Sequence, residues 1–105
     1  MPDHVHLMIY PCGCDVAAIL KSIKQPFARE MGKLGRKPFD ALWQAGGGYD
    51  RNVTAKETAL RMIDYIHMNP VRHGLCESPQ EYIWSSAASW YELGESPLVP
   101  NLFEW

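Results

Sequence analysis

His-Val-His-Leu-Met-Ile-Tyr, residues 4–10, is the stretch that decides the predicted fold class. Side chains alternate between the two faces of a β-strand, so a strand here would place His4 and His6 on one face. The apolar side chains between and after them would lie on the opposite face and pack into a core. Two imidazoles on one face of a strand can chelate one metal ion. The sequence therefore predicts a strand over residues 4–10 that carries half of a metal site.

The length and composition indicate one folded domain. The 105 residues suffice for a single modest core, and 47% apolar residues with 11% aromatic residues favour a globular chain. The sequence has no apolar run of about eighteen residues, and its first residues lack the pattern of a secretory signal. The three cysteines, with Cys12 and Cys14 two apart, form neither a disulfide framework nor a complete zinc set. We expect a reduced, cytoplasmic setting.

Charge is distributed unevenly, although the net charge is only −2. Basic side chains gather in residues 21–37, where Glu30 is the single acid, whereas the chain from residue 76 onward has five acids and neither Lys nor Arg. Such asymmetry favours a basic patch that meets phosphates. A solvated helix surface explains the same charges about equally well.

A first helix is predicted directly after the strand. Asp15 is a good N-cap, and apolar residues at helical spacing continue to about Leu34. Pro26 lies inside this stretch and should kink the helix or split it in two. The glycines at residues 46–48 then indicate a hairpin or a wide loop.

A second helix should begin at Thr54-Ala55-Lys56-Glu57, which has the sequence of a capping box. It should end near Met68, because Pro70 disfavours helical geometry in the residue before it. A short helix near residues 85–93 and an irregular tail follow. The apolar residues predicted to face the core from the second helix are Ala59, Leu60, Ile63 and Ile66.

Tyr65 and Asn69 are four residues apart on this second helix, so they share a face. That face lies roughly opposite the apolar one, which predicts a phenol and a carboxamide presented outward. Arg61, one turn earlier, is placed to hold a phosphate near the same surface. A metal-binding histidine pair beside a phenol suits phosphoryl transfer, since a cation neutralises the phosphate while an oxygen nucleophile attacks in line.

In these features the chain resembles a known family, the REP-associated tyrosine transposases. They are single-tyrosine HUH nucleases, in which two histidines flank an apolar residue. The resemblance runs from Pro2 to about Trp90. Its motifs are His4-Val5-His6, Trp43-Gln44, Tyr49-Asp50-Arg51, the segment from Tyr65 to Arg72 and Tyr82-Ile83-Trp84-Ser85-Ser86.

The resemblance implies a site and a chemistry. His4 and His6 would hold Mg²⁺ or Mn²⁺ over the scissile phosphate, and Asn69 would be a third, helix-borne ligand. Tyr65 would attack single-stranded DNA, forming a 5′-phosphotyrosine link and freeing a 3′-hydroxyl.

The implied substrate is hairpin DNA with short flanking guide sequences, which places the protein at the bacterial nucleoid. Arg72, together with Arg61, Lys21 and Lys24, would be candidates for holding the DNA backbone.

The implied fold is an α+β, ferredoxin-like α/β sandwich, with an antiparallel sheet and helices on one face. Family members carry several dozen residues before the histidine pair, whereas here the pair begins at position 4. We therefore expect a sandwich that is incomplete at its N-terminal end, with its strand edges paired in a homodimer. Residues 1–105 would form one domain, with a core over about 1–75 and an extension over about 76–105.

Two other functions stay open at this stage. One is a catalytically inactive remnant that binds DNA without nicking it, and the other is a small structural metal-binding or dimerisation module. A structural module would give the tyrosine, the asparagine and the histidine pair no shared function. The sequence also leaves open whether Tyr65 serves its own histidine pair or a partner's.

Overall fold

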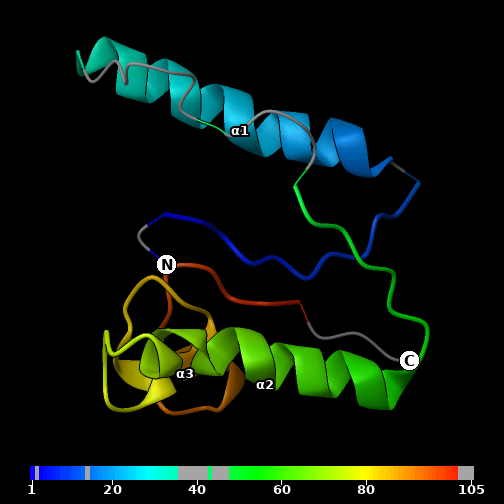
Figure 1. The fold of residues 1–105 in the computed structure, drawn as a ribbon, viewed down its shortest axis with the longest axis vertical. Helices are drawn as coiled ribbons and strands as arrows, with labels where there is room; N and C mark the ends of the chain where they lie inside the picture. The colour runs from blue at the N-terminus through cyan, green and yellow to red at the C-terminus, as the bar shows by residue number, and fades with distance from the viewer. Residues whose placement is uncertain (2, 14, 36–42, 44–47, 102–105) are drawn as a thin grey trace. The chain divides into compact units, whose positions relative to one another are not determined.

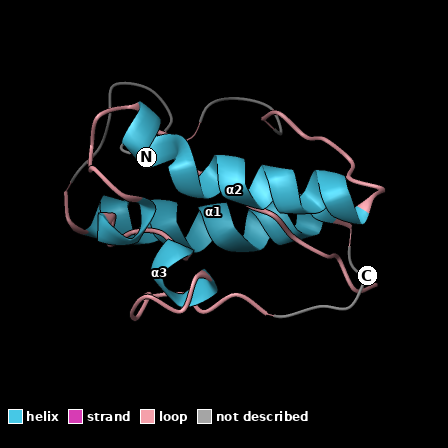
Figure 2. Cartoon of the chain, turned by 90° about the horizontal axis from the view of Figure 1, so that it is seen from below, coloured by secondary structure: helices cyan, strands magenta, loops and turns pink. Residues whose placement is uncertain are grey.

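The computed structural model describes helices joined by loops (Figures 1 and 2). The described residues are 1, 3–13, 15–35, 43 and 48–101. In chain order the elements are α1 (Val16–Lys33), α2 (Lys56–Arg72), the 3-10 helix η1 (Pro79–Glu81) and α3 (Ala87–Trp90). Over the described residues there is no strand, and Figure 2 accordingly draws only helices and loops there.

The prediction of an α+β, ferredoxin-like sandwich with an antiparallel sheet is therefore wrong. A strand is stable only as a member of a sheet, because its backbone N–H and C=O groups need a neighbouring strand to bond to. Residues 4–10 meet no such neighbour among the described residues and form a loop. The apolar side chains Val5 and Leu7, expected in a core, are 60% and 44% exposed.

The chain divides into two compact units, which we describe separately. The histidine unit comprises Met1–Met8 and Val53–Trp105, and the α1 unit comprises Ile9–Asn52. The N-terminal histidines thus belong to the same unit as α2, η1 and α3. A single domain over residues 1–105, with a core at 1–75 and an extension at 76–105, stays a prediction.

The predicted limits of α1 are confirmed. Asp15 adopts an extended conformation, and its Oδ1 accepts a hydrogen bond from the backbone N–H of Ala18 over 2.7 Å. The helix ends at Lys33, and Gly35 follows with a φ of 71°, a left-handed value that glycine adopts without strain. Pro26 lies inside α1, and the helix is not split there.

Trp43 packs on α1 within the α1 unit. Its ring centroid is 5.8 Å from that of Phe27, and its indole Nε1 donates a hydrogen bond to the Lys24 carbonyl over 3.1 Å. The hairpin or loop expected at the glycines falls mostly on residues 44–47, which lie outside the described residues. Tyr49–Val53, on its far side, forms no strand.

The second helix is longer at its C-terminal end than the sequence predicts. α2 begins at Lys56 with Ala55 as N-cap, without a side-chain capping bond, so the predicted capping box is not formed. It continues through Pro70 to Arg72, and the N–H of His73 still donates to the Asn69 carbonyl. Proline removes one backbone donor from a helix and leaves the later ones intact. Asn69 and Pro70 are both buried, which favours continuing the helix over ending it.

The core of the histidine unit is small. Ala59 and Ile63 of α2 are 1% and 8% exposed, as predicted for the core face, and Ala87 and Ala88 of α3 are equally buried. Leu60, predicted to face the core, is 44% exposed. The short segments η1 and α3 pack together, and η1 also packs on α2. The predicted short helix near residues 85–93 is confirmed as α3.

No helix among the described residues has both the length and the apolar character needed to cross a membrane.

Candidate metal and nucleophile site

The histidine pair lies beside α2 within the histidine unit. The Nε2 atoms of His4 and His6 are 3.2 Å apart, and the two rings meet edge to face with centroids 4.8 Å apart. Two nitrogen ligands about 2.1 Å from one ion, at right angles, would be about 3.0 Å apart. The observed separation is therefore close to that of two ligands on a single ion.

Asn69 of α2 completes a set of three polar side chains. It is 3% exposed, and its Nδ2 donates a hydrogen bond to His6 Nε2 over 3.2 Å. Its Oδ1 is buried and has no hydrogen-bond partner among the described residues. Leaving such an atom unsatisfied costs about 1–3 kcal/mol, and a half-turn of the amide would bring it toward the histidines. The burial corrects the sequence interpretation, which placed Asn69 on the face away from the core.

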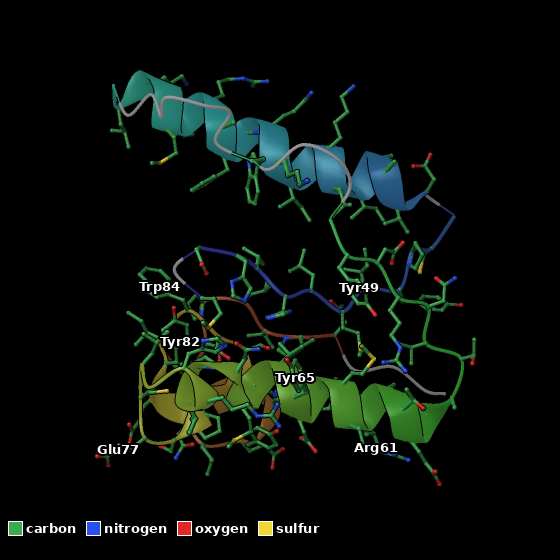
Figure 3. The ribbon with its side chains drawn as sticks, viewed as in Figure 1. Tyr49, Arg61, Tyr65, Glu77, Tyr82 and Trp84 are labelled. Carbon is green, nitrogen blue, oxygen red and sulfur yellow. The ribbon has the colours of Figure 1, made fainter. Side chains whose placement is uncertain are left out.

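Tyr65 lies one helical turn before Asn69 and is 47% exposed (Figure 3). Its ring centroid is 6.2 Å from that of His6. The guanidinium carbon of Arg72 lies 4.6 Å from the centre of the same phenol ring, at cation–π distance. The helix thus holds an accessible phenol near both an imidazole and a permanent positive charge.

The site contains two further residues, Asp3 and His73, that the sequence analysis did not predict. Asp3 Oδ1 accepts a hydrogen bond from His4 Nδ1 over 2.6 Å, and the His73 ring centroid lies 6.4 Å from that of His4. His73 is four residues after Asn69, so the helical spacing was a usable signal. Asp3 directly precedes the predicted strand, and the sequence pattern contained no signal for it.

The electrostatics of the site follow from its crowded imidazoles. Burial lowers the pKa of His6, and the positive charges of His4, the N-terminus and His73 lower it further. The hydrogen bond from His4 is the main cause that lowers the pKa of Asp3. A neutral imidazole and an ionised carboxylate are the forms in which these groups bind and orient metal ions.

Arg61, Lys21 and Lys24 are the other candidate DNA contacts. Arg61 is exposed on α2, and its guanidinium is 3.9 Å from the Glu57 carboxylate (Figure 3). Lys21 and Lys24 lie on α1 and are described within the α1 unit alone, where the Lys24 ammonium is 5.6 Å from the Trp43 ring centre. The structure therefore brings Arg72 to the tyrosine, and the DNA roles of all four basic residues stay predictions.

The donor set available for a metal is two imidazoles and one amide. In the part of the chain that the structure describes, no cluster of three or more His, Cys, Asp or Glu side chains is placed to hold an ion. Mg²⁺ binds few protein groups and keeps water or phosphate oxygens as its other ligands. The buried, unpartnered Oδ1 of Asn69 beside two convergent ring nitrogens fits such a partial seat.

Comparisons of the chain with family models, with curated proteins and with solved structures gave no match.

Proposed function

We propose that this protein is a metal-dependent tyrosine transposase of the HUH type, which cleaves and rejoins single-stranded hairpin DNA. One observation carries the proposal: His6 and Asn69, 63 residues apart in sequence, are hydrogen-bonded to each other. Tyr65 lies one turn from Asn69 with its ring beside His6. A purely structural role for the histidine pair would not explain why an exposed phenol lies beside it.

His4, His6 and the Asn69 amide are the residues that would hold Mg²⁺ or Mn²⁺. When bound, such a cation neutralises a phosphate and stabilises the charge that develops on it during displacement. All three protein ligands are uncharged when the imidazoles are neutral, so the anionic phosphate would add the first negative ligand. We therefore expect DNA and metal to bind cooperatively.

Tyr65 is the nucleophile in this proposal. Its phenolic oxygen attacks the scissile phosphorus, and the Oη–P bond forms while the P–O3′ bond breaks. The phenol proton passes to solvent, and the departing 3′ oxygen takes up a proton to become a hydroxyl. One phosphodiester replaces another, so a free 3′-hydroxyl can reverse the step and rejoin strands without ATP.

Arg72 orients the nucleophile. Its guanidinium stacks on the Tyr65 ring, and its N–H groups are donors suited to a phosphate oxygen. A stacked guanidinium therefore restricts the orientation of the Tyr65 side chain and attracts the phosphate that the phenol attacks. The prediction that Arg72 contacts DNA follows from the same placement.

The test uses hairpin oligonucleotides with randomised single-stranded flanks, labelled at the 3′ end, with Mn²⁺ present. Attack by Tyr65 leaves the labelled fragment on the protein, so a denaturing gel should contain a slow, labelled protein band. The same DNA labelled at the 5′ end should instead give a shorter free strand that a polymerase extends from its 3′-hydroxyl. Tyr65→Phe should abolish the band, whereas Tyr49→Phe, which alters a tyrosine that is 91% exposed, should keep it.

Two results would contradict the proposal. An adduct of undiminished yield in Tyr65→Phe would remove the tyrosine from its role. Salt-dependent oligonucleotide binding with no adduct for any probe would favour a protein that binds DNA without nicking it.

A further inference from the structure

Asp3 makes the shortest hydrogen bond in the neighbourhood of the histidine pair, from His4 Nδ1 to its Oδ1 over 2.6 Å. The two residues are adjacent, and in a strand their side chains would point apart. Residue 3 lies in a bend instead, which lets the carboxylate fold back onto the ring. The absence of a strand at this point is thus what makes the contact geometrically accessible.

The contact determines which nitrogen of His4 is free. An imidazole that donates from Nδ1 carries its lone pair on Nε2 when it is neutral. His6 accepts from the Asn69 amide at its own Nε2, so its lone pair is on that atom too. The two Nε2 atoms that can offer a lone pair to an ion are 3.2 Å apart. A cation between the rings would be a shared partner for both nitrogens.

We propose that Asp3 is a positioning residue of the metal seat, forming a carboxylate–imidazole–metal chain through His4. Its carboxylate holds the Nδ1–H tautomer and aims Nε2 at the ion. Such outer partners typically change metal affinity about 10- to 100-fold when they are removed. The inference rests on the proposed function, because it needs the histidine pair to bind a cation.

The test measures the dissociation constant for Mn²⁺ from the electron paramagnetic resonance signal of the free ion. Asp3→Ala should weaken binding about 10-fold or more, because the tautomer is no longer held. Asp3→Asn should lose less affinity, because an amide oxygen can still accept from Nδ1 although its charge is gone. Asp50→Ala, which removes an exposed aspartate in the α1 unit, should leave the constant unchanged.

A second readout follows the tautomer without any metal. In ¹⁵N NMR spectra of labelled histidine, His4 should carry its proton on Nδ1 in the wild-type protein near neutral pH. It should shift toward the Nε2–H form in Asp3→Ala and return toward Nδ1–H in Asp3→Asn. A residue that only supports the fold would not move this equilibrium.

The outcomes separate this inference from the proposed function. If the wild-type protein binds Mn²⁺ and Asp3→Ala binds it within about twofold, the role of Asp3 is overturned and the metal seat stands. If the wild-type protein binds no more Mn²⁺ than a His4→Ala, His6→Ala double variant, the metal seat itself is overturned, and the inference with it.

Discussion

His67 is a buried histidine that the sequence interpretation passed over. It is 3% exposed, and its Nε2 lies 2.8 Å from the Ser86 hydroxyl oxygen. Its Nδ1 is buried and has no partner in the part of the chain that the structure describes. Its ring packs against those of Trp90 and Tyr91. It lies four residues after the buried Ile63 on α2, so the two side chains share the packed face of the helix. We assign it to holding α2 against the C-terminal segment.

Lowering the pH should destabilise the protein through His67. Burial lowers its pKa below the ordinary histidine value of 6.5, an effect that the nearby Asp64 charge partly offsets. The unfolded chain therefore binds the proton more readily, so the stabilising contribution is complete above that value and is lost as pH falls toward the folded-state pKa. Urea unfolding at about pH 7.5 and about pH 5.5 should give a lower free energy of unfolding at the acid value. His67→Gln should reduce the difference, and an unchanged difference would contradict the assignment.

The two arginines of α2 should differ in their effect on strand cleavage. Arg72 stacks on Tyr65, whereas Arg61 is paired with Glu57 on the exposed surface of α2. Arg72→Ala should slow adduct formation about 10- to 100-fold, because the phenol is no longer held. Arg61→Ala should leave the rate nearly unchanged and serves as the matched control. Single-turnover kinetics with saturating DNA measure both, and equal losses would rule out a special role for Arg72.

At the scale of elements, α2 was predictable in its existence and only partly in its extent. Apolar spacing located Ala59 and Ile63 correctly in the core. It missed the end of the helix, because the local preference at Pro70 was overcome by burial of Asn69 and Pro70. This longer helix carries Arg72 back to Tyr65. A helix that ended at Met68 would give the site no such stack.

The end of α2 depends on a glycine. Gly74 has a φ of 73°, and side chains other than glycine cost about 1–2 kcal/mol in that conformation. Gly74→Ala should therefore lower the free energy of unfolding by about that amount. Gly32→Ala is the control, because Gly32 lies inside α1 with open space around its Cβ position. This variant should be about 0.5–1 kcal/mol more stable than the wild-type protein. Thermal unfolding followed by circular dichroism compares the two, and destabilisation of both would argue against the backbone explanation.

At the scale of the whole molecule, the sequence predicted the meeting of the site residues better than the fold around them. The spacing of His4 and His6 and the helical spacing of Tyr65 and Asn69 are local properties, visible without knowing any long-range contact. Whether residues 4–10 join a sheet depends on a partner strand elsewhere in the chain, which local alternation cannot reveal. The predicted site residues therefore lie close together, although the unit that holds them consists of helices and loops and contains no sheet among the described residues.

The most direct test of the account asks whether Tyr65 becomes joined to DNA in a reaction that needs the N-terminal histidines. Trypsin cuts after Arg61 and Arg72, and the peptide 62–72 between them contains a single tyrosine, Tyr65. After reaction with hairpin DNA and Mn²⁺, digestion with nuclease and trypsin should yield this peptide carrying a residual nucleotide, identified by mass spectrometry. It should be absent without metal and in the His4→Ala, His6→Ala double variant. A nucleotide on another peptide, or the same modified peptide from the double variant, would contradict the account.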